Sequence, residues 1–429
     1  MATRREFLET LGPPVLASIA LPFLNGNASA IASELQGHTA PPDATMQDED
    51  FWSQVQQAFT VDRSMINLNN GGVSPSPAMV QDAMKRHLDY SNLAPVYTMW
   101  RVLEPRRETV RQRLARAWDV DPEEIALTRN ASESLQICQF GIDLEPGDEI
   151  VTTSQDYPRM LTTFRQRERR EGVTLKLIEI PVPAEDPNEI IDRFRAAITD
   201  QTRLILASHV INISGQVLPV KEIAALGRAR GIPVIIDGAH AFAHLDFTLA
   251  ELDCDYYATS LHKWLFAPHG TGLLYVRRDR IRDTWPLMAA EETQDDDIRK
   301  FEQIGTHPAA NTLAIAEALT FHQSIGNARK LQRLLYLRDY WAQRLIENDR
   351  VQLHTSLKPG AACAIATVNI EGVDPGDLTR HLWVNHRIIV TPVKHEQFQG
   401  IRVTPSVYTT LPELNRFCDA MGDVIVNGV

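Results

Sequence analysis

The sequence lacks the features that mark several classes of protein. It has few cysteines for its 429 residues, and none of them shows the CxxC or Cys/His spacing of a zinc site. No apolar stretch reaches the roughly 18 residues that a transmembrane helix needs. The formal net charge of −12 argues against nucleic acid or an anionic membrane surface as a partner. We expect the four cysteines to be small buried hydrophobic residues: Cys138, Cys254, Cys363 and Cys418.

Residues 1–30 resemble a twin-arginine export signal rather than part of the fold. The pair Arg4-Arg5 precedes a mildly apolar stretch over residues 11–24, and the segment ends on Ala-Ser-Ala, a typical cleavage site. The alternative is an amphipathic N-terminal helix, but paired prolines interrupt the stretch, and proline breaks helices. We therefore expect the protein to reach the periplasm already folded, through the twin-arginine translocase. The polar residues 31–50 are expected to form a linker.

Strand and helix patterns alternate from residue 125 onward. The hydrophobic content of 44% is enough for a large core, and the length allows two or three domains. Alternating units of this kind predict an α/β fold with a mostly parallel sheet and helices on both faces. Ligands of such sheets bind at the carboxyl ends of the strands. The predicted strands cover residues 125–128, 149–153, 173–180, 202–207, 234–237, 255–259 and 272–276.

An acidic residue and a lysine follow two of these strands. One strand ends on Asp237, and the next ends on Ser260-Leu-His-Lys263 before a glycine-rich turn. Singly, Asp237 would be a turn former and Lys263 a solvated side chain. Together, on adjacent strand ends, they fit pyridoxal 5'-phosphate (PLP). The lysine amine forms an imine with the aldehyde of PLP, and the carboxylate keeps the pyridine nitrogen protonated, so that the ring withdraws electrons.

These stretches resemble the class V aminotransferases, a family of fold type I PLP enzymes, and most closely its isopenicillin-N-epimerase-like branch. The similar motifs are D-G-A-H at 237–240, S-x-H-K at 260–263 and S-H-V-x-N-x-x-G at 208–215. The segments 301–307 and 401–408 resemble two further family motifs. The resemblance covers nearly all of residues 60–429.

The resemblance implies a division into three parts after the linker. Residues 51–100 form an N-terminal segment that packs with the small domain. Residues 101–308 form the large PLP-binding domain, and residues 309–429 form a smaller α+β C-terminal domain. It also implies a homodimer with shared active sites.

The resemblance assigns Lys263 to the imine and to proton transfer at the substrate Cα, and Asp237 to the pyridine nitrogen. Asn212 would bind the phenolate oxygen, and His240 would support the ring or the substrate. Tyr157 would stack on the ring, with Asp156 as the weaker candidate. The chain departs here from the E-H-H pattern of cysteine desulfurases, which leaves both residues open. The phosphate would be held by Ala131, Ser132, Ser260, His262 and, from the partner subunit, Thr306.

A helix N-terminus supports the phosphate assignment. Asn130 and Glu133 form a capping-box pattern, and the free N–H groups and positive dipole end of a helix suit a phosphate. The alternative is simple capping, since such caps are common.

Substrate contacts are expected from two further stretches. Arg402 would bind the substrate α-carboxylate through two parallel hydrogen bonds; the alternative is a surface arginine. Asn69, Asn70 and Gly71 lie in an Asn/Gly turn that borders the substrate in relatives, and an ordinary turn explains them equally well.

These assignments predict an enzyme that acts on the amino group of an amino acid or of a peptide-borne amino acid, through an external aldimine and a Cα carbanion. The fate of that carbanion is not set by the fold. Desulfurase chemistry is disfavoured because residues 391–399 contain no cysteine. Export favours periplasmic side-chain modification of the siderophore pyoverdine; the alternative is a periplasmic amino-acid epimerase or aminotransferase. A PLP-fold binding protein without turnover is disfavoured by the set Asp237, Lys263 and Arg402.

Overall fold

The computed structural model describes residues 35–429. The predicted export signal and the first part of the predicted linker lie outside the described residues. Within the described part of the chain, no helix is both long and apolar enough to cross a membrane.

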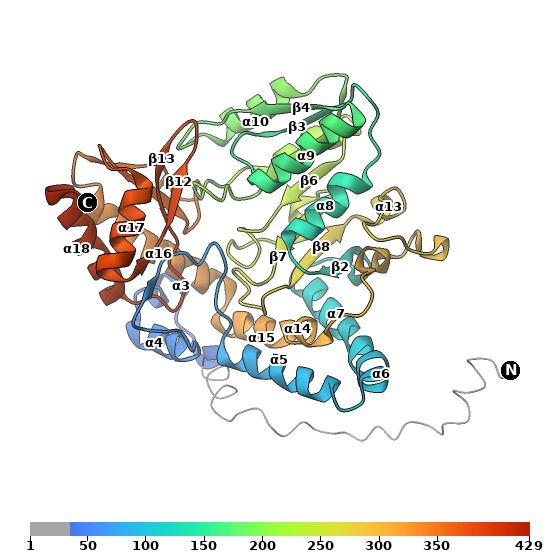
Figure 1. The fold of residues 1–429 in the computed structure, drawn as a ribbon, viewed down its shortest axis with the longest axis horizontal. Helices are drawn as coiled ribbons and strands as arrows, with labels where there is room; N and C mark the ends of the chain where they lie inside the picture. Colours follow the sequence, from blue (N-terminus) through green and yellow to red (C-terminus); the bar gives the residue numbers. More distant parts are fainter. Residues whose placement is uncertain (1–34) are drawn as a thin grey trace.

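A seven-stranded sheet forms the centre of the molecule (Figure 1). Its strand order is β2-β8-β7-β6-β5-β3-β4. β8 runs antiparallel to both neighbours, and the other neighbouring pairs are parallel. The predicted α/β fold with a mostly parallel sheet is therefore confirmed. The strands are β2 (Ile125–Thr128), β3 (Glu149–Thr153), β4 (Thr174–Ile178), β5 (Thr202–Ser208), β6 (Val234–Asp237), β7 (Tyr256–Ser260) and β8 (Gly272–Val276).

Both faces of the inner strands are buried, because side chains alternate along each strand and helices pack against each face. Ile235 and Tyr256 pack in a cluster with residues of α8 and α9, while Ile236 and Tyr257 pack in a second cluster with residues of α10 and α11. Strands covered on both faces are apolar throughout, as the runs in the sequence are. The helices are α8 (Ala131–Gly141), α9 (Pro158–Glu171), α10 (Pro187–Ala197) and α11 (Val220–Arg228).

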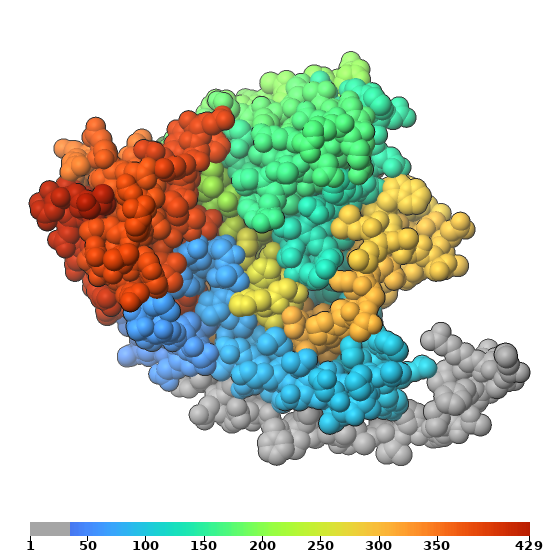
Figure 2. All heavy atoms as spheres, viewed as in Figure 1, coloured from blue at the N-terminus to red at the C-terminus, as the bar shows by residue number. Residues whose placement is uncertain are grey.

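The C-terminal domain is a four-stranded antiparallel sheet of order β12-β13-β10-β9 with a core of its own. A short parallel pair joins β1 to β11 beside it. Figure 2 shows this domain (orange to red) beside the central part (green), with the N-terminal helices (blue to cyan) along one edge of both. Its elements are β9 (Val351–Leu353), β10 (Ala366–Ile370), α17 (Pro375–His386), β11 (Ile388–Ile389), β12 (Thr391–Lys394), β13 (Gln399–Val403) and α18 (Leu411–Asn427), with β1 at Ile66–Asn67.

The described part of the predicted linker, residues 35–50, packs against the rest of the protein. Leu35 is fully buried, and Arg333 in α16 (Asn327–Leu345) binds the Met46 carbonyl at 2.9 Å and Glu49 at 2.5 Å. The helices here are α3 (Pro42–Thr45) and α4 (Glu49–Gln57). The linker prediction is therefore wrong for these residues, because a few buried side chains and a distant arginine hold an otherwise polar stretch.

The boundary between the two domains lies later than predicted. α14 (Ala309–Leu313) and α15 (Ile315–Ile325) pack against α5 (Ala78–Ser91) and belong to the core of the large domain. Residues 51–100 thus contact both domains, since β1 joins the small one and α5 the large one. The helix α7 (Arg107–Ala117) follows a π-helical turn and a 3-10 turn. The remaining elements are α6 (Pro95–Tyr97), η1 (Thr98–Leu103), η2 (Glu104–Arg106), η3 (Pro122–Glu124), α12 (Leu249–Leu252), α13 (Arg278–Ile281), η4 (Glu292–Gln294) and η5 (Ile298–Glu302).

Candidate active site

A cavity of about 320 Å³ lies at the carboxyl ends of β5, β6 and β7. The parallel register places Ser208 opposite Asp237 and Asp237 opposite Ala258, so the polar residues that end these strands meet at one edge. The cavity brings together these predicted residues: Ala131, Ser132, Tyr157, Asn212, Asp237, His240, Ser260, His262, Lys263 and Arg402. It also includes residues that sequence reasoning did not select: Gly72, Leu135, Ser208, Val210 and Ala239.

The N-terminus of α8 forms one wall of the cavity. The Asn130 side chain accepts from the Glu133 N–H at 2.9 Å, as a capping box requires, but Glu133 in turn accepts from the Arg129 N–H at 2.6 Å. The Ala131 N–H donates to the Ser260 hydroxyl at 2.9 Å. A Cβ on Gly272 would lie 2.6 Å from the Asn130 nitrogen, so only glycine lets β8 pass this close. These N–H and hydroxyl groups can hold a phosphate.

His262 lies between this wall and Lys263. Its Nδ1 is 3.1 Å from the Thr271 carbonyl oxygen. Burial lowers the pKa of His262 to about 4, so the ring is neutral and Nδ1–H donates to that oxygen. A phosphate dianion in the cavity would favour the imidazolium form, whose Nε2–H can donate to it.

Lys263 presents its amine to the cavity. Its Nζ lies 3.2 Å from His240 Nε2. Burial lowers the pKa of Lys263 to about 8, although the nearby Asp237 opposes this shift. At pH 7 about a tenth of the amine is therefore unprotonated, far more than for an ordinary lysine, and the unprotonated amine is the form that attacks an aldehyde. His240 Nδ1 is buried and has no hydrogen-bond partner among the described residues.

Asp237 is a buried carboxylate without an ion-pair partner among the described residues. Its Oδ1 accepts from the Ala239 N–H at 2.9 Å. Burial raises the pKa of Asp237 to about 6, the Ala239 hydrogen bond and Lys263 oppose this shift, and the buried Asp156 adds to it. Such a carboxylate fits a cationic ring nitrogen, because that nitrogen would supply the missing positive charge. The residues present therefore fit PLP.

Asp156 is not among the residues that line the cavity. Its carboxylate accepts from Ser208 Oγ and Thr152 Oγ1, each at 2.5 Å, and from the Thr153 N–H at 2.9 Å. The neighbouring Tyr157 lines the cavity. Of the two residues considered for stacking on the ring, only Tyr157 lines the cavity, and its stacking role stays a prediction.

Arg402 is a buried cation with no carboxylate partner among the described residues. It is 8% exposed, and its guanidinium donates to the Asn212 carbonyl at 3.0 Å and to Asn69 Oδ1 at 2.9 Å. Burial lowers the pKa of Arg402 to about 10, because the charged guanidinium is desolvated and no carboxylate lies beside it to compensate. The arrangement can bind a carboxylate that enters the cavity.

Comparison with known proteins gives the same family. The family model named Aminotransferase class-V matches residues 66–395. The chain belongs to the class V aminotransferase family. It is a PLP-dependent enzyme of that family, as the fit of the cavity residues indicates.

Relatives span almost the whole described chain. Isopenicillin N epimerase from Amycolatopsis lactamdurans is 29% identical over 392 residues, which cover 87% of this chain and 98% of the relative. The apo cysteine desulfurase from Thermococcus onnurineus NA1 has the same fold, with a TM-score of 0.77, 22% identity, and coverage of 87% and 98%. A C-DES variant with glycine covalently linked to its PLP cofactor has a TM-score of 0.73 and 22% identity over 84% of this chain and 97% of that one.

The prediction that Asn70 contacts substrate is wrong. Asn70 is fully buried, its amide nitrogen donates to the Asn67 and Thr404 carbonyls, and its oxygen accepts from the Tyr408 hydroxyl at 2.5 Å. The neighbouring Asn69 instead contacts Arg402. Gly71 lines the cavity.

Thr306 lies outside the cavity of its own chain and is exposed. Glu302 anchors its segment, since it accepts from Arg111 at 2.6 Å and from the Leu127 N–H at 2.6 Å. A role for Thr306 in a partner's site stays a prediction.

The four cysteines are buried and free, as expected. Cys363 lies near Arg402, but burial raises the pKa of its thiol to about 12. A buried thiol with a raised pKa is a poor nucleophile. Residues 391–399 form β12 and the turn into β13, again without cysteine. None of the described residues that line the cavity is a cysteine.

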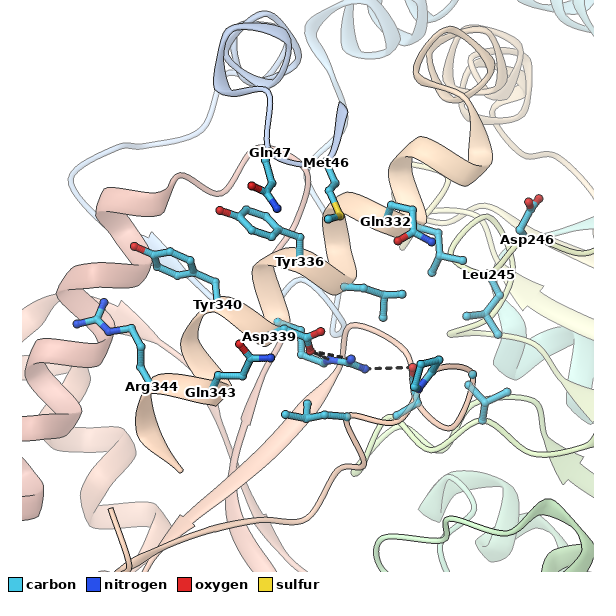
Figure 3. Close-up of a pocket in the computed structure, with 18 of the residues that line it drawn as sticks. Met46, Gln47, Leu245, Asp246, Gln332, Tyr336, Asp339, Tyr340, Gln343 and Arg344 are labelled. Atoms are coloured by element: carbon cyan, nitrogen blue, oxygen red, sulfur yellow. Dashed lines mark hydrogen bonds and ion pairs between the residues drawn. The ribbon is translucent and has the colours of Figure 1, made fainter. Parts of the chain in front are cut away.

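A larger cavity of about 1200 Å³ lies along α16, on the side facing residues 357–362. Figure 3 shows Met46 and Gln47 from the segment between α3 and α4 opposite Tyr336 and Tyr340 of α16. The described residues that line it include no lysine. Its buried cation, Arg338, is paired with Asp339 at 2.7 Å and donates to two backbone carbonyls. It offers no group suited to PLP chemistry.

Proposed function

We propose that this enzyme uses PLP to act on the amino group of an amino acid or a peptide-borne amino acid. The observation that carries the proposal is the convergence of three uncompensated groups, Lys263, Asp237 and Arg402, on one cavity. PLP, when bound, supplies an aldehyde that condenses with amines and a ring that withdraws electrons from Cα. The three groups match the aldehyde, the ring nitrogen and a substrate carboxylate.

In this proposal Lys263 moves the proton at the substrate Cα. Its lowered pKa of about 8 lets it act as a base near neutral pH. His240 Nε2 lies 3.2 Å from the amine and can orient it by a hydrogen bond; burial lowers the pKa of His240 well below its ordinary value, so its ring stays neutral. Arg402 holds the substrate carboxylate in place, and this orientation determines which bond of Cα faces Lys263.

The phosphate is assigned to the α8 wall, that is, to the Ala131 and Ser132 N–H groups with the side chains of Ser132, Ser260 and His262. Asn212 is assigned to the phenolate oxygen and Tyr157 to the ring face. The support for these roles is the family resemblance of the motifs, together with the fact that all of these residues line the cavity.

We also propose a homodimer in which Thr306 reaches the partner's phosphate. An apolar surface on the edge formed by α5, α6 and η1 supports this arrangement, because soluble proteins rarely expose so many large apolar side chains together. The exposed residues are Leu88, Leu93, Val96, Tyr97 and Trp100.

For the substrate we propose the side chain of a pyoverdine siderophore precursor in the periplasm. The support is the twin-arginine pattern of residues 1–30, since the route exports folded proteins and PLP is loaded before export. Changing Arg4-Arg5 to Lys-Lys should leave the protein in the cytoplasm, as fractionation and immunoblotting would show. Periplasmic recovery of that variant in wild-type amount would overturn the export proposal.

A periplasmic amino-acid epimerase or aminotransferase is the second candidate. It is favoured by the likeness to isopenicillin N epimerase along 98% of that relative. Mass spectrometry of candidate amines and pyoverdine precursors incubated with the holoenzyme in deuterated water separates the outcomes. Deuterium at Cα with the amine retained supports epimerisation, loss of the amine supports transamination, and a changed precursor side chain supports siderophore modification. No change in any tested amine would contradict the proposal.

A further inference from the structure

A second buried lysine lies directly behind the turn that carries Lys263. Lys330 in α16 is 0% exposed, and no carboxylate of the described residues forms an ion pair with it. Its Nζ donates to the Trp264 carbonyl oxygen, lies 3.3 Å from His322 Nδ1 and lies 4.3 Å from the centre of the Phe266 ring. The Lys330 amine thus contacts Trp264, which directly follows Lys263, and Phe266, which is three positions after Lys263.

The turn that Lys330 contacts has an unusual backbone. Phe266 has φ +62°, in the left-handed region that residues other than glycine rarely adopt. The Ala267 N–H closes the turn on the Leu261 carbonyl at 3.1 Å. Such a conformation persists only where the surroundings hold it.

The Trp264 side chain is held from the opposite side. Its ring stacks on His244 with centroids 3.8 Å apart. His244 Nδ1 lies 2.9 Å from the His240 carbonyl oxygen, and His240 Nε2 lies 3.2 Å from Lys263 Nζ. His244 therefore fixes the ring of Trp264, and Lys330 fixes its carbonyl. The first contact is connected to the Lys263 amine through His240, and the second through the backbone, because Trp264 follows Lys263.

A lysine is a costly choice for this position. Burial lowers the pKa of Lys330 well below its ordinary value because the charged form is desolvated. A methionine would fill similar space without that penalty. What the amine adds is an N–H for the Trp264 carbonyl, which has no other donor among the described residues and would otherwise be buried without a partner.

We propose that Lys330 is a positioning residue for Lys263: by donating to the Trp264 carbonyl it fixes the turn from which the Lys263 amine reaches the cavity. This inference rests on the proposed role of Lys263 as the lysine that bonds PLP. A displacement of about 1 Å in a reacting group can slow a reaction on the order of a hundredfold, so a loosened turn should have a measurable effect.

The test follows imine formation, which needs no known substrate. PLP is added to the cofactor-free full chain, and absorbance records the rate of imine formation and the fraction of bound PLP in the imine form. Lys330→Met should slow the reaction about tenfold or more and lower the imine fraction. The dissociation constant of the initial noncovalent PLP complex, taken from the dependence of the imine rate on PLP concentration, should stay within about threefold, because the phosphate contacts are untouched.

Arg333→Met is the matched control. Arg333 is equally buried and lies one turn further along α16, but it contacts Met46 and Glu49 rather than the Lys263 turn. It should leave the imine rate within twofold of wild type, and thermal unfolding of both variants shows whether each is folded at the assay temperature. A wild-type rate in Lys330→Met, or an equal slowing in Arg333→Met, would overturn the proposal.

A further variant covers a failure of Lys330→Met to fold. His322→Phe removes the ring nitrogen beside Lys330 Nζ and should slow imine formation about threefold; an unchanged rate would count against the positioning role. Wild-type protein that forms no imine at Lys263 would instead overturn the proposed function, and this inference with it.

Discussion

The two cavities of this enzyme differ in size and in how their charges are compensated. The larger one, along α16, has a volume of about 1200 Å³, and its buried Arg338 is paired with Asp339 and with backbone carbonyls. The smaller one, of about 320 Å³, is lined by Lys263, Asp237 and Arg402, none of which forms an ion pair with another described residue. Volume alone would select the wrong cavity for chemistry.

The difference has a physical reason. A buried charge without a partner destabilises the fold, and it shifts the pKa of the group toward the neutral form. Here the pKa of Asp237 is raised to about 6 and that of Lys263 is lowered to about 8. Shifts of this kind cluster at functional sites because a ligand supplies the missing charges. The cavity with uncompensated charges is therefore the one built for a ligand.

The largest effect is expected from Lys263→Ala. The change removes the amine that bonds the aldehyde and moves the Cα proton, so the imine absorbance should disappear and turnover should fall about 10³-fold or more. Retention of both absorbance and turnover would show that another group does this work. Asp339→Ala in the larger cavity is the control and should retain both.

Asp237→Asn should lower turnover about 10²-fold while making the cofactor-free protein more stable at pH 7. The pKa of Asp237 is raised from 3.8 to about 6 in the folded state, so the folded protein binds more protons than the unfolded chain between about pH 4 and 6. Its stability falls as the pH rises through that window, and above it the ionised carboxylate costs roughly 1–3 kcal/mol.

Thermal unfolding of the cofactor-free protein from pH 4 to 7 measures this contribution. The Asp237→Asn variant should lack this pH-dependent loss of stability. Its higher stability relative to wild type at pH 7 should shrink once PLP is bound. A variant less stable than wild type at pH 7 would mean that the carboxylate is already compensated without a ligand.

Arg402→Lys should raise KM about 30-fold with a smaller effect on kcat. The planar guanidinium of Arg402 binds Asn69 and the Asn212 carbonyl, and it can bind a carboxylate with its remaining N–H groups. Lysine keeps the positive charge but lacks this planar set of donors. Steady-state kinetics with a substrate and with its decarboxylated analogue measures the effect. Equal KM changes for both compounds would argue against carboxylate binding.

The smallest effect is expected in the larger cavity. Tyr340→Phe removes the hydroxyl that donates to Asn415 at 2.8 Å on the rim of that cavity. It should leave kcat and KM within twofold and lower the unfolding free energy by about 1 kcal/mol. A tenfold loss of activity would show that this cavity takes part in the reaction and would remove the contrast drawn here.

The residues of the smaller cavity could be predicted where a local pattern marked them. Asp237 ends a strand, Lys263 follows the end of another by three residues, and Asn130 caps a helix. Parallel strands bring such ends together. The choice between Asn69 and Asn70 could not be made in this way. Tyr408 decides this choice, because its hydroxyl donates a hydrogen bond to the Asn70 side chain from 338 residues away in the sequence.

Long-range packing accounts for the other differences. Residues 35–50 look polar, yet Arg333 binds Glu49 across 284 positions of sequence. Lys330 gives no signal in the sequence, because a lysine on an amphipathic helix is ordinarily solvated. Only its contact with the Trp264 carbonyl, 66 residues away, shows that it is buried beside the active site.

The most direct test of the account distinguishes the two buried lysines, Lys263 and Lys330. Borohydride reduction of the PLP-loaded protein fixes the cofactor to the amine that holds it, and peptide mapping by mass spectrometry then locates the label. The account predicts a single labelled peptide with PLP on Lys263. A label on Lys330 or on any other residue, or no label at all, would contradict it.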